Sequence, residues 1–347
     1  MLKSLGNFMD PTDKSLKCVF DAGNKKIIEM TLLKNRENTD VVCVPTHHFC
    51  NLGCKMCHLT CNSLNKTSEK IDYKDFILAL SLTLCKQDTN NVLKETGYES
   101  YDLMTGTRRT NKKKLLISFM GVGEPTLNLD LILEINRNIA NIKRFLHYEE
   151  VGLALATMMP NDNLRKYLPI LNKENVPLKI HFSLHNPIDL RRKELIPASS
   201  LSVRECFDIL REYRDVISKN ETIMNGFALC HKTNDLVEIH YTLIDGVNDG
   251  ADELNALFKL LNEYNFTIKF IKFNPKEDMS ISLKEKEWVA RIQRYCNVRV
   301  KSYDPPGKAV GSSCGEFTKH YYHEEIETAK ELDEFLKWKN KYQVYDE

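Results

Sequence analysis

Short apolar runs alternate with amphipathic stretches along most of this chain. Seven runs of four to eight residues have the length and the β-branched and aromatic content of strands. They are Val41–Val44, Leu115–Met120, Val151–Thr157, Leu178–Leu184, Val237–Ile244, Thr267–Phe273 and Val298–Tyr303. Apolar positions at helical spacing lie between them and predict helices over Asp72–Lys86, Leu129–Phe145, Asn163–Asn172, Val203–Ser218, Asp252–Tyr264 and Leu283–Tyr295.

This alternation predicts an α/β protein with a parallel sheet and right-handed crossovers. About six repeats fit a partial (β/α)6 barrel, whose chemistry is expected where the strands end and the βα loops begin. Ser202 and Glu205 have the spacing of a capping box and mark one helix start.

Additional segments are expected at both ends of the barrel. Lys17–Asp21 and Lys26–Leu33 flank Ala22-Gly23-Asn24 and predict a β-hairpin extension. Tyr321–Tyr342 reads as a charged C-terminal helix. The predicted division is 1–40 (extension), 41–317 (barrel) and 318–347 (helical tail), with an insertion at about 88–114.

Composition is that of a globular protein: 347 residues, 42% hydrophobic and 28% charged. The longest apolar runs are too short to span a membrane, and no secretory signal is visible, so no membrane partner is expected. The net charge of +1 means that a nucleic-acid partner would depend on a local basic patch. One such patch comprises Arg108, Arg109 and Lys112–Lys114, although a solvated loop would have the same composition.

Eleven cysteines are the unusual feature, and five of them fall between Cys43 and Cys61. Without a secretion signal, cysteines indicate metal binding or catalysis and a reducing, cytoplasmic location. Cys50, Cys54 and Cys57 form a C-x3-C-x2-C pattern directly after the first barrel strand. A zinc site completed by Cys61, His47, His48 or His58 is one interpretation, and chance clustering is another.

An iron–sulfur cluster explains three cysteines better, because a 4Fe-4S cluster with three thiolates keeps one iron open for a small molecule. The spacing resembles the radical S-adenosylmethionine (SAM) superfamily, in which the open iron holds SAM. That resemblance implies a 4Fe-4S cofactor and reductive cleavage of SAM to a 5′-deoxyadenosyl radical, with an external flavodoxin- or ferredoxin-like electron donor.

Further motifs follow the later strands in order. They are Gly121-Val-Gly-Glu-Pro125, Ser183-Leu-His-Asn186, Gly246-Val-Asn-Asp249, Phe273-Asn-Pro275 and Ser313-Cys-Gly-Glu-Phe317. This ordered set resembles the RlmN/Cfr-type radical SAM methyltransferases, whose patterns are GMGEP, SLHA, GVND, an N-P strand end and ACGQL. The resemblance covers about residues 17–317 and implies methylation of an adenine carbon (C2 or C8) in ribosomal or transfer RNA, using two SAM molecules per turnover.

The resemblance also gives roles to individual residues. Cys314 would carry the methyl group as S-methylcysteine and form a protein–RNA crosslink, and Cys43 would resolve that crosslink by forming a disulfide. Glu29 is the nearest match to the family's glutamate base, although a hairpin glutamate on the surface is the simpler interpretation. The implied SAM contacts are Gly123, Glu124, Thr157, Ser183, His185 and Asn274.

The chain departs from the family pattern in ways that bear on its substrate. Ala154–Pro160 replaces the family's S-T-x-G, so that Thr157 would supply a displaced hydroxyl. Only about sixteen residues precede the hairpin, where the family has an RNA-holding helical domain. The same methyl-synthase chemistry on a nucleotide or other small molecule is therefore one alternative, and a zinc-binding module without catalysis is another. A monomer is expected.

Overall fold

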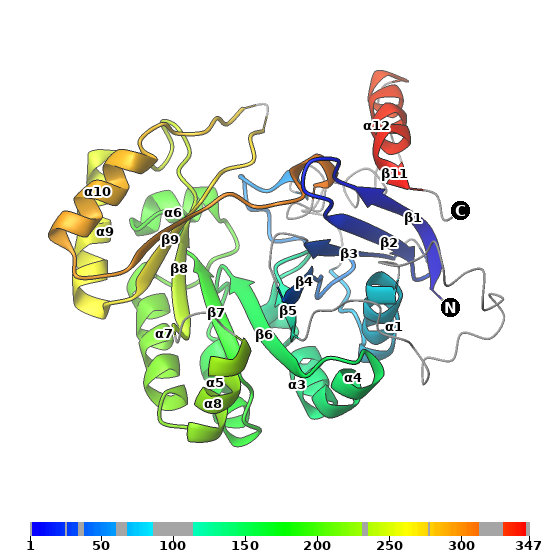
Figure 1. Cartoon of the computed structure of the whole chain (residues 1–347). Helices are drawn as coiled ribbons and strands as arrows, with labels where there is room; N and C mark the ends of the chain where they lie inside the picture. Colours follow the sequence, from blue (N-terminus) through cyan, green and yellow to red (C-terminus); the bar gives the residue numbers. More distant parts are fainter. Residues whose placement is uncertain are drawn as a thin grey trace. The chain divides into compact units, whose positions relative to one another are not determined.

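The computed structural model describes residues 2–24, 26–33, 38–59, 68–85, 114–230, 235–276, 278–311 and 329–344. Figure 1 shows its strands and helices, coloured along the chain. The strands are β1 (Lys3–Met9), β2 (Leu16–Asp21), β3 (Ile27–Leu33), β4 (Thr39–Cys43), β5 (Lys114–Phe119), β6 (Glu150–Thr157), β7 (Leu178–Ser183), β8 (Val237–Tyr241), β9 (Thr267–Ile271), β10 (Val300–Tyr303) and β11 (Gln343–Val344). The α-helices are α1 (Tyr73–Cys85), α3 (Leu129–Arg137), α4 (Ile139–Phe145), α5 (Asn163–Lys173), α6 (Asp189–Leu195), α7 (Val203–Ile217), α8 (Glu221–Cys230), α9 (Ala251–Tyr264), α10 (Glu285–Tyr295) and α12 (Ala329–Tyr342).

The sheet is open and largely parallel, as the partial barrel requires. Its strand order starts at β10 and ends at β11 without closing on itself. The pairs β4–β5, β7–β8, β8–β9 and β9–β10 are parallel. The N-terminal strands β1 to β4 and the short β11 pair in antiparallel fashion. The predicted α/β fold and hairpin extension are confirmed, and the hairpin is widened by β1.

The chain packs into two compact units. The first comprises residues 1–51, 65–153 and 306–347, and the second comprises 52–64 and 154–305. Strand β6 therefore begins in one unit and ends in the other. These units combine distant parts of the sequence, and the predicted limits at residues 40 and 317 remain a prediction.

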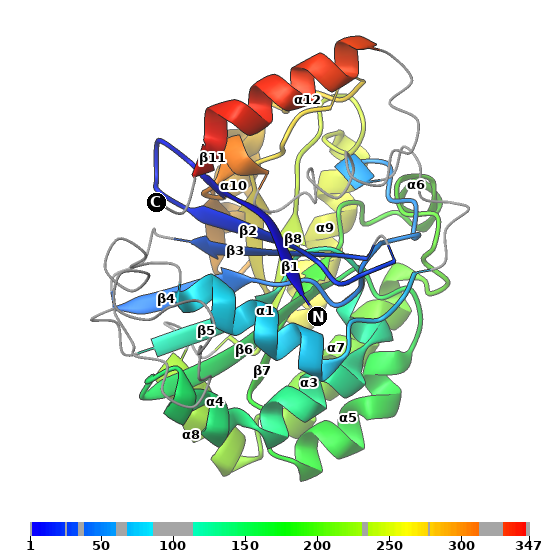
Figure 2. The same ribbon diagram turned by 90° about the vertical axis from the view of Figure 1, so that its right-hand side faces the viewer.

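In the first unit, the N-terminal sheet is covered on both faces. Helix α1 packs against β2 and β3, as Figure 2 shows. Strand alternation places Val19 and Ile27 on the opposite face, where they pack with Phe8 and Val310. Trp338 of α12 stacks on Phe8 with ring centroids 5.1 Å apart. The segment around Val310 thus belongs to the core of this unit, although it follows β3 by almost 280 positions in sequence.

In the second unit, amphipathic helices bury their apolar faces against the parallel strands. Helix α7 begins at the predicted capping box, because Oγ of Ser202 accepts from the N–H of Glu205 and the Glu205 carboxylate accepts from the N–H of Ser202. Phe207 of α7 packs edge-on to Phe182 of β7.

Two sequence predictions of element length were wrong for identifiable reasons. The helix expected over Leu129–Phe145 is two helices, because the backbone of Asn138 leaves the helical conformation and its side chain donates to the carbonyl of Glu134. The strand expected to reach Ile244 ends at Tyr241, because the chain turns there. The Asn248 side chain donates to the carbonyl of Thr242 and accepts from the N–H of Ile244.

Candidate active site

The cysteine loop is held by backbone hydrogen bonds within the second unit. The N–H of Cys57 donates to the carbonyl of Cys54, and the N–H of Lys55 donates to that of Leu195. Lys276, which follows β9, donates from Nζ to the carbonyl of Lys55 at 2.8 Å. Gly53 has a φ of +69°, a conformation that favours glycine. This loop therefore has a defined backbone.

Each thiol of the pattern is of the type that iron–sulfur clusters use as ligands. Cys54 and Cys57 in the second unit and Cys50 in the first are all half-buried. Sγ of Cys54 lies 3.5 Å from Sδ of Met158, within an apolar cluster around Leu195. Soft thiolate ligands in a partly apolar setting are the donors that iron–sulfur clusters use. Cys61, a fourth ligand in the zinc interpretation, lies outside the described residues.

In the first unit, the glycine turn after β5 packs closely on the chain that follows β4. The N–H groups of Thr46 and His47 both donate to the carbonyl of Val122. A Cβ added to Gly123, whose φ is +102°, would lie 2.5 Å from Nδ1 of His47. Burial, assisted by Lys70, lowers the pKa of His47 to about 4, so this imidazole is neutral. Gly123 is thus required by packing as well as by backbone conformation.

Glu124 is buried in the same turn. Its Oε1 accepts from the backbone N–H of Thr126 at 3.0 Å and from the Thr126 hydroxyl at 2.6 Å. These bonds cap the short 3-10 helix Pro125–Leu127 and fix the orientation of the carboxylate. A fixed, buried carboxylate is suited to an ammonium group, such as that of the methionine part of SAM.

The sheet of the first unit brings the predicted base and the predicted resolving cysteine to one face. Cys43 lies directly opposite Thr31, and Thr31 lies opposite Lys17 in the next pair of strands. Glu29 is two positions from Thr31 and therefore points to the same side. Glu29 is buried, with 6% of its surface exposed, so the interpretation as a surface hairpin residue is wrong. Its Oε2 lies 2.6 Å from Nζ of Lys17.

In the second unit, the four predicted SAM contacts come at or just after strand ends. Thr157 ends β6 and Ser183 ends β7, while His185 and Asn274 follow β7 and β9. The hydroxyl of Thr157 accepts from the N–H of Met159 at 2.8 Å, so it stabilises the turn that replaces the family's S-T-x-G. Nδ1 of His185 accepts from the N–H of Thr242 at 3.2 Å. Burial, with a contribution from Arg192, lowers the pKa of His185 to about 3, and the ring is neutral.

Arg192 joins these strand ends. It is buried, with 2% of its surface exposed, and its guanidinium donates to the carbonyls of Leu184 (3.1 Å) and Met158 (2.7 Å) and to the hydroxyl of Ser199. A cation with this many acceptors holds the loops after β6 and β7 in one arrangement. The motifs quoted from the sequence do not include Arg192, and they gave no indication of this structural role.

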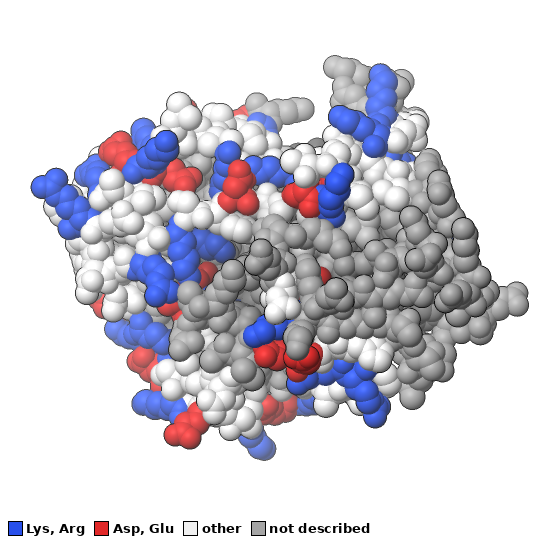
Figure 3. All heavy atoms as spheres, in the orientation of Figure 1, with Lys and Arg blue, Asp and Glu red and all other residues white. Residues whose placement is uncertain are grey.

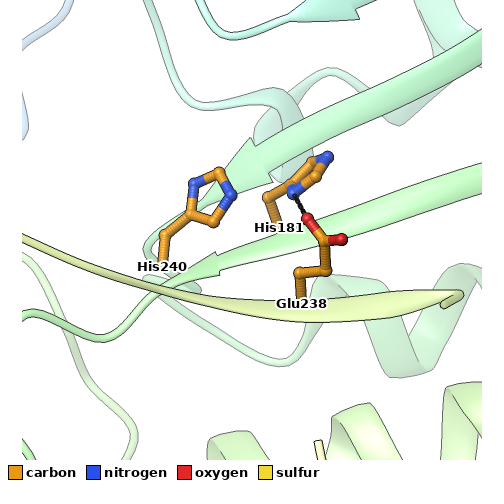
Figure 4. Close-up of side chains that lie close together, drawn as sticks. All are labelled: His181, Glu238 and His240. Atoms are coloured by element: carbon orange, nitrogen blue, oxygen red, sulfur yellow. Dashed lines mark ion pairs between the residues drawn. The ribbon is translucent and has the colours of Figure 1, made fainter. Parts of the chain in front are cut away.

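A second group of ionisable side chains lies deeper in the second unit. His181 of β7 and Glu238 and His240 of β8 are all buried, and their potential ligand atoms lie within 4.8 Å of one another (Figure 4). Oε1 of Glu238, however, already accepts from Lys179 at 2.9 Å and from Lys301, and Oε2 lies 3.2 Å from Nδ1 of His181. Because two ammonium groups compensate this carboxylate, we interpret the group as an ion-pair network and not as a metal centre.

Burial and neighbouring charges together determine the protonation of this network. It lowers the pKa of His181 to about 4 and that of His240 well below the ordinary value. Burial opposes ionisation of Glu238, but the hydrogen bond from His181 and the charge of Lys179 outweigh it and lower the pKa of the carboxyl. The network therefore contains neutral imidazoles around an ionised carboxylate.

Some predicted residues lie outside the described part of the chain, and some structural partners were missed. Cys314 and the basic residues 108–113 belong to the first group. Lys114, the last residue of that basic run, pairs with Glu150 at 2.8 Å. Lys17 is a structural partner that the sequence analysis missed. A single lysine within an apolar strand is common at solvent-facing positions, so its sequence gave no signal.

Known proteins with similar sequences and structures belong to the class of protein that the sequence motifs indicated. No family model matches this chain. Named relatives include the probable dual-specificity RNA methyltransferases RlmN of Clostridioides difficile, 24% identical over 89% of this chain and 77% of the relative, and of Thermus thermophilus, 25% identical over 88% and 74%. Among solved structures, a radical SAM methyltransferase from Sphaerobacter thermophilus matches with a TM-score of 0.65 and 20% identity, over 91% of this chain and 80% of the other.

The fold is therefore that of the radical SAM methyltransferases. By sequence, the chain is a relative of the RNA methyltransferases of the RlmN type, as its motifs predicted.

Proposed function

We propose that this chain is a radical SAM methyltransferase that methylates an adenine carbon, C2 or C8, of ribosomal or transfer RNA. The observation that carries the proposal is the shared face of the first unit. Cys43, Glu29 and the segment that leads to Cys314 all belong to that face. A zinc module has no use for a buried glutamate on the same face of the sheet as a buried cysteine.

The chain's cysteines hold the cofactor in this proposal. Cys50, Cys54 and Cys57 would hold a 4Fe-4S cluster, and Glu124, Gly123, Thr157, Ser183, His185 and Asn274 would orient SAM. A cluster bound there would supply one-electron chemistry, both for the reductive cleavage of SAM and for taking up the electron that the RNA adduct gives up.

The two remaining cysteines and Glu29 perform the transfer. The thiolate of Cys314 first takes a methyl group from one SAM, with S-adenosylhomocysteine as the leaving group. After hydrogen removal, the methylene carbon on Cys314 bonds to the adenine carbon, and Glu29 takes the ring proton. The thiolate of Cys43 then attacks the Cys314 sulfur. A disulfide forms, and the released carbon keeps the bonding electrons and takes a proton to become the methyl group.

RNA would be bound through local contacts and not through the overall electrostatic field of the protein. In the view of Figure 3, acidic and basic side chains are interspersed over the second unit. None of the described helices is both long and apolar enough to cross a membrane. A monomer in a reducing cytoplasm, served by a flavodoxin- or ferredoxin-like electron donor, completes the proposal.

The first test is peptide mass spectrometry of Cys314 after anaerobic purification, reconstitution and incubation with SAM. An S-methyl group on Cys314, absent from Cys314→Ala, is the expected result. The same protein should transfer a methyl group to adenine in RNA, and Cys43→Ala should accumulate a protein–RNA crosslink. SAM cleavage without methylation of Cys314 would contradict the mechanism. Methylation of Cys314 without any RNA product would point to the same chemistry on another substrate.

A further inference from the structure

A lysine lies at the centre of the candidate site in the first unit. Lys17 of β2 is 1% exposed. Its Nζ donates to Oε2 of Glu29 at 2.6 Å and to the carbonyl oxygen of Gly311 at 2.7 Å. Removing an ammonium group from water is costly unless acceptors replace the water. Here the acceptors come from β3 and from a segment 294 positions further along the chain than Lys17.

The segment Gly307–Gly311 is fixed on the N-terminal sheet by further contacts. Its hydrogen bonds join Gly307 N to Asp13 Oδ2 (2.6 Å), Ala309 N to Asp10 Oδ2 (3.0 Å) and Ala309 O to Trp338 Nε1 (3.0 Å). Val310, within the same segment, is fully buried. Lys17 provides the contact nearest in sequence to Cys314 within this set, because it binds Gly311.

One ammonium group therefore contacts both the predicted base and the last described residue of this segment. Its hydrogen bonds to Glu29 and Gly311 fix the carboxylate and the Gly311 backbone relative to each other.

We propose that Lys17 is a positioning residue for the second half of the reaction. It holds the Glu29 carboxylate ready to take the ring proton, and it anchors the segment Gly307–Gly311 on the same face of the sheet. This inference rests on the proposed function, since the roles of Glu29, Cys43 and Cys314 are taken from it.

The test compares Lys17→Met, which keeps the length of the side chain without its charge, with Lys17→Arg and with the control Lys179→Met. The control removes a buried lysine from another ion pair, with Glu238 in the second unit. Two quantities are measured: amide hydrogen exchange at residues 309–311 in the protein without cofactors, and the rates of Cys314 methylation and of crosslink release in the reconstituted enzyme.

In Lys17→Met, exchange at residues 309–311 should rise roughly tenfold, because the segment loses one of its fixed contacts. Methylation of Cys314, which needs no base on RNA, should stay within about threefold of the wild type. Crosslink release should slow roughly a hundredfold, the scale of a displaced general base. Lys17→Arg should restore part of that rate. Lys179→Met should change neither the exchange at residues 309–311 nor the ratio of the two rates.

Unchanged exchange and an unchanged ratio of rates in Lys17→Met would overturn the inference, and so would an equal loss of both rates, which indicates a structural role alone. If Lys17→Met does not fold, Lys17→Arg replaces it, and a wild-type ratio of the rates of Cys314 methylation and crosslink release in Lys17→Arg would be the contradicting outcome. Failure of the proposed function itself is recognised separately, because the wild type would then not methylate Cys314 while the exchange measurement still reports on Lys17.

Discussion

The guanidinium of Arg192 donates a hydrogen bond of 2.7 Å to the carbonyl of Met158, and so joins helix α6 to the loop after β6. The same group reaches the carbonyl of Leu184 after β7. Two loops that carry predicted SAM contacts are thus held by one buried cation. Thr157 and His185 are each adjacent in sequence to one of these two carbonyl groups.

Replacing Arg192 by lysine should destabilise the protein by about 3 kcal/mol, because a single ammonium cannot reach all the acceptors and leaves buried carbonyls without partners. The free energy of unfolding is measured by urea denaturation. The control is Arg191→Lys, whose side chain is half-exposed and pairs with Asp252 and Glu253. That change should cost less than about 1 kcal/mol. Equal effects of the two substitutions would show that the buried contacts of Arg192 contribute little.

Gly123→Ala should destabilise the protein by about 3 kcal/mol. The new methyl group would meet His47 at 2.5 Å, and the backbone is in the left-handed region. Gly23→Ala is the matched control, because its φ of +86° is similarly unfavourable but nothing lies within 4 Å of the added atom. It should cost about 1 kcal/mol. Thermal denaturation of both variants isolates the loss of stability that is due to the clash with His47. Similar losses of stability in the two variants would rule out a packing requirement at Gly123.

The sequence predicts the parts of this fold that depend on local pattern. Apolar runs bounded by turn residues located β4 to β10, and the capping box located the start of α7. Strand β1 was missed, since Gly6 and Asn7 interrupt its apolar pattern and its pairing with β2 contains an irregularity. The break between α3 and α4 depends on one asparagine, which a periodicity argument does not register.

The residues of the candidate site also fall into those that the sequence identifies and those that only tertiary packing reveals. Cys50, Cys54 and Cys57 are recognisable because their spacing alone carries the chemistry. Lys17 is not, because its importance comes from two acceptors that only tertiary packing brings to it. Glu29 was ambiguous in sequence for the same reason, and its burial in the structure excludes the interpretation as a surface residue.

Stability should fall between pH 6.5 and 4 through His181. The folded protein holds this imidazole neutral, with a pKa of about 4, whereas the unfolded chain binds a proton near pH 6.5. The stability contribution is therefore fully present above pH 6.5 and is lost as the pH falls toward 4. Lowering the pH from 7.5 to 5.5 should cost about 1 kcal/mol from His181 alone.

Urea denaturation of the wild type and of His181→Gln at both pH values measures this contribution. The variant should lose less stability than the wild type over the interval. His147→Asn is the control, because His147 is exposed and its φ of +54° suits asparagine. An identical pH dependence in the wild type and in His181→Gln would mean that folding does not lower the pKa of His181.

Cys54→Ala should reduce the bound iron and sulfide to background after anaerobic reconstitution, because a cluster held by three thiolates cannot spare one of them. Cys206→Ala is the matched control. Burial raises the pKa of the Cys206 thiol to about 11, so that it does not supply a thiolate near neutral pH. This variant should keep its iron.

Because a bound cluster stabilises the folded state, reconstitution should raise the melting temperature of the wild type and of Cys206→Ala but not of Cys54→Ala. Zinc in place of iron in the wild type, still lost in Cys54→Ala, would assign the loop to a zinc site and remove the basis for radical chemistry.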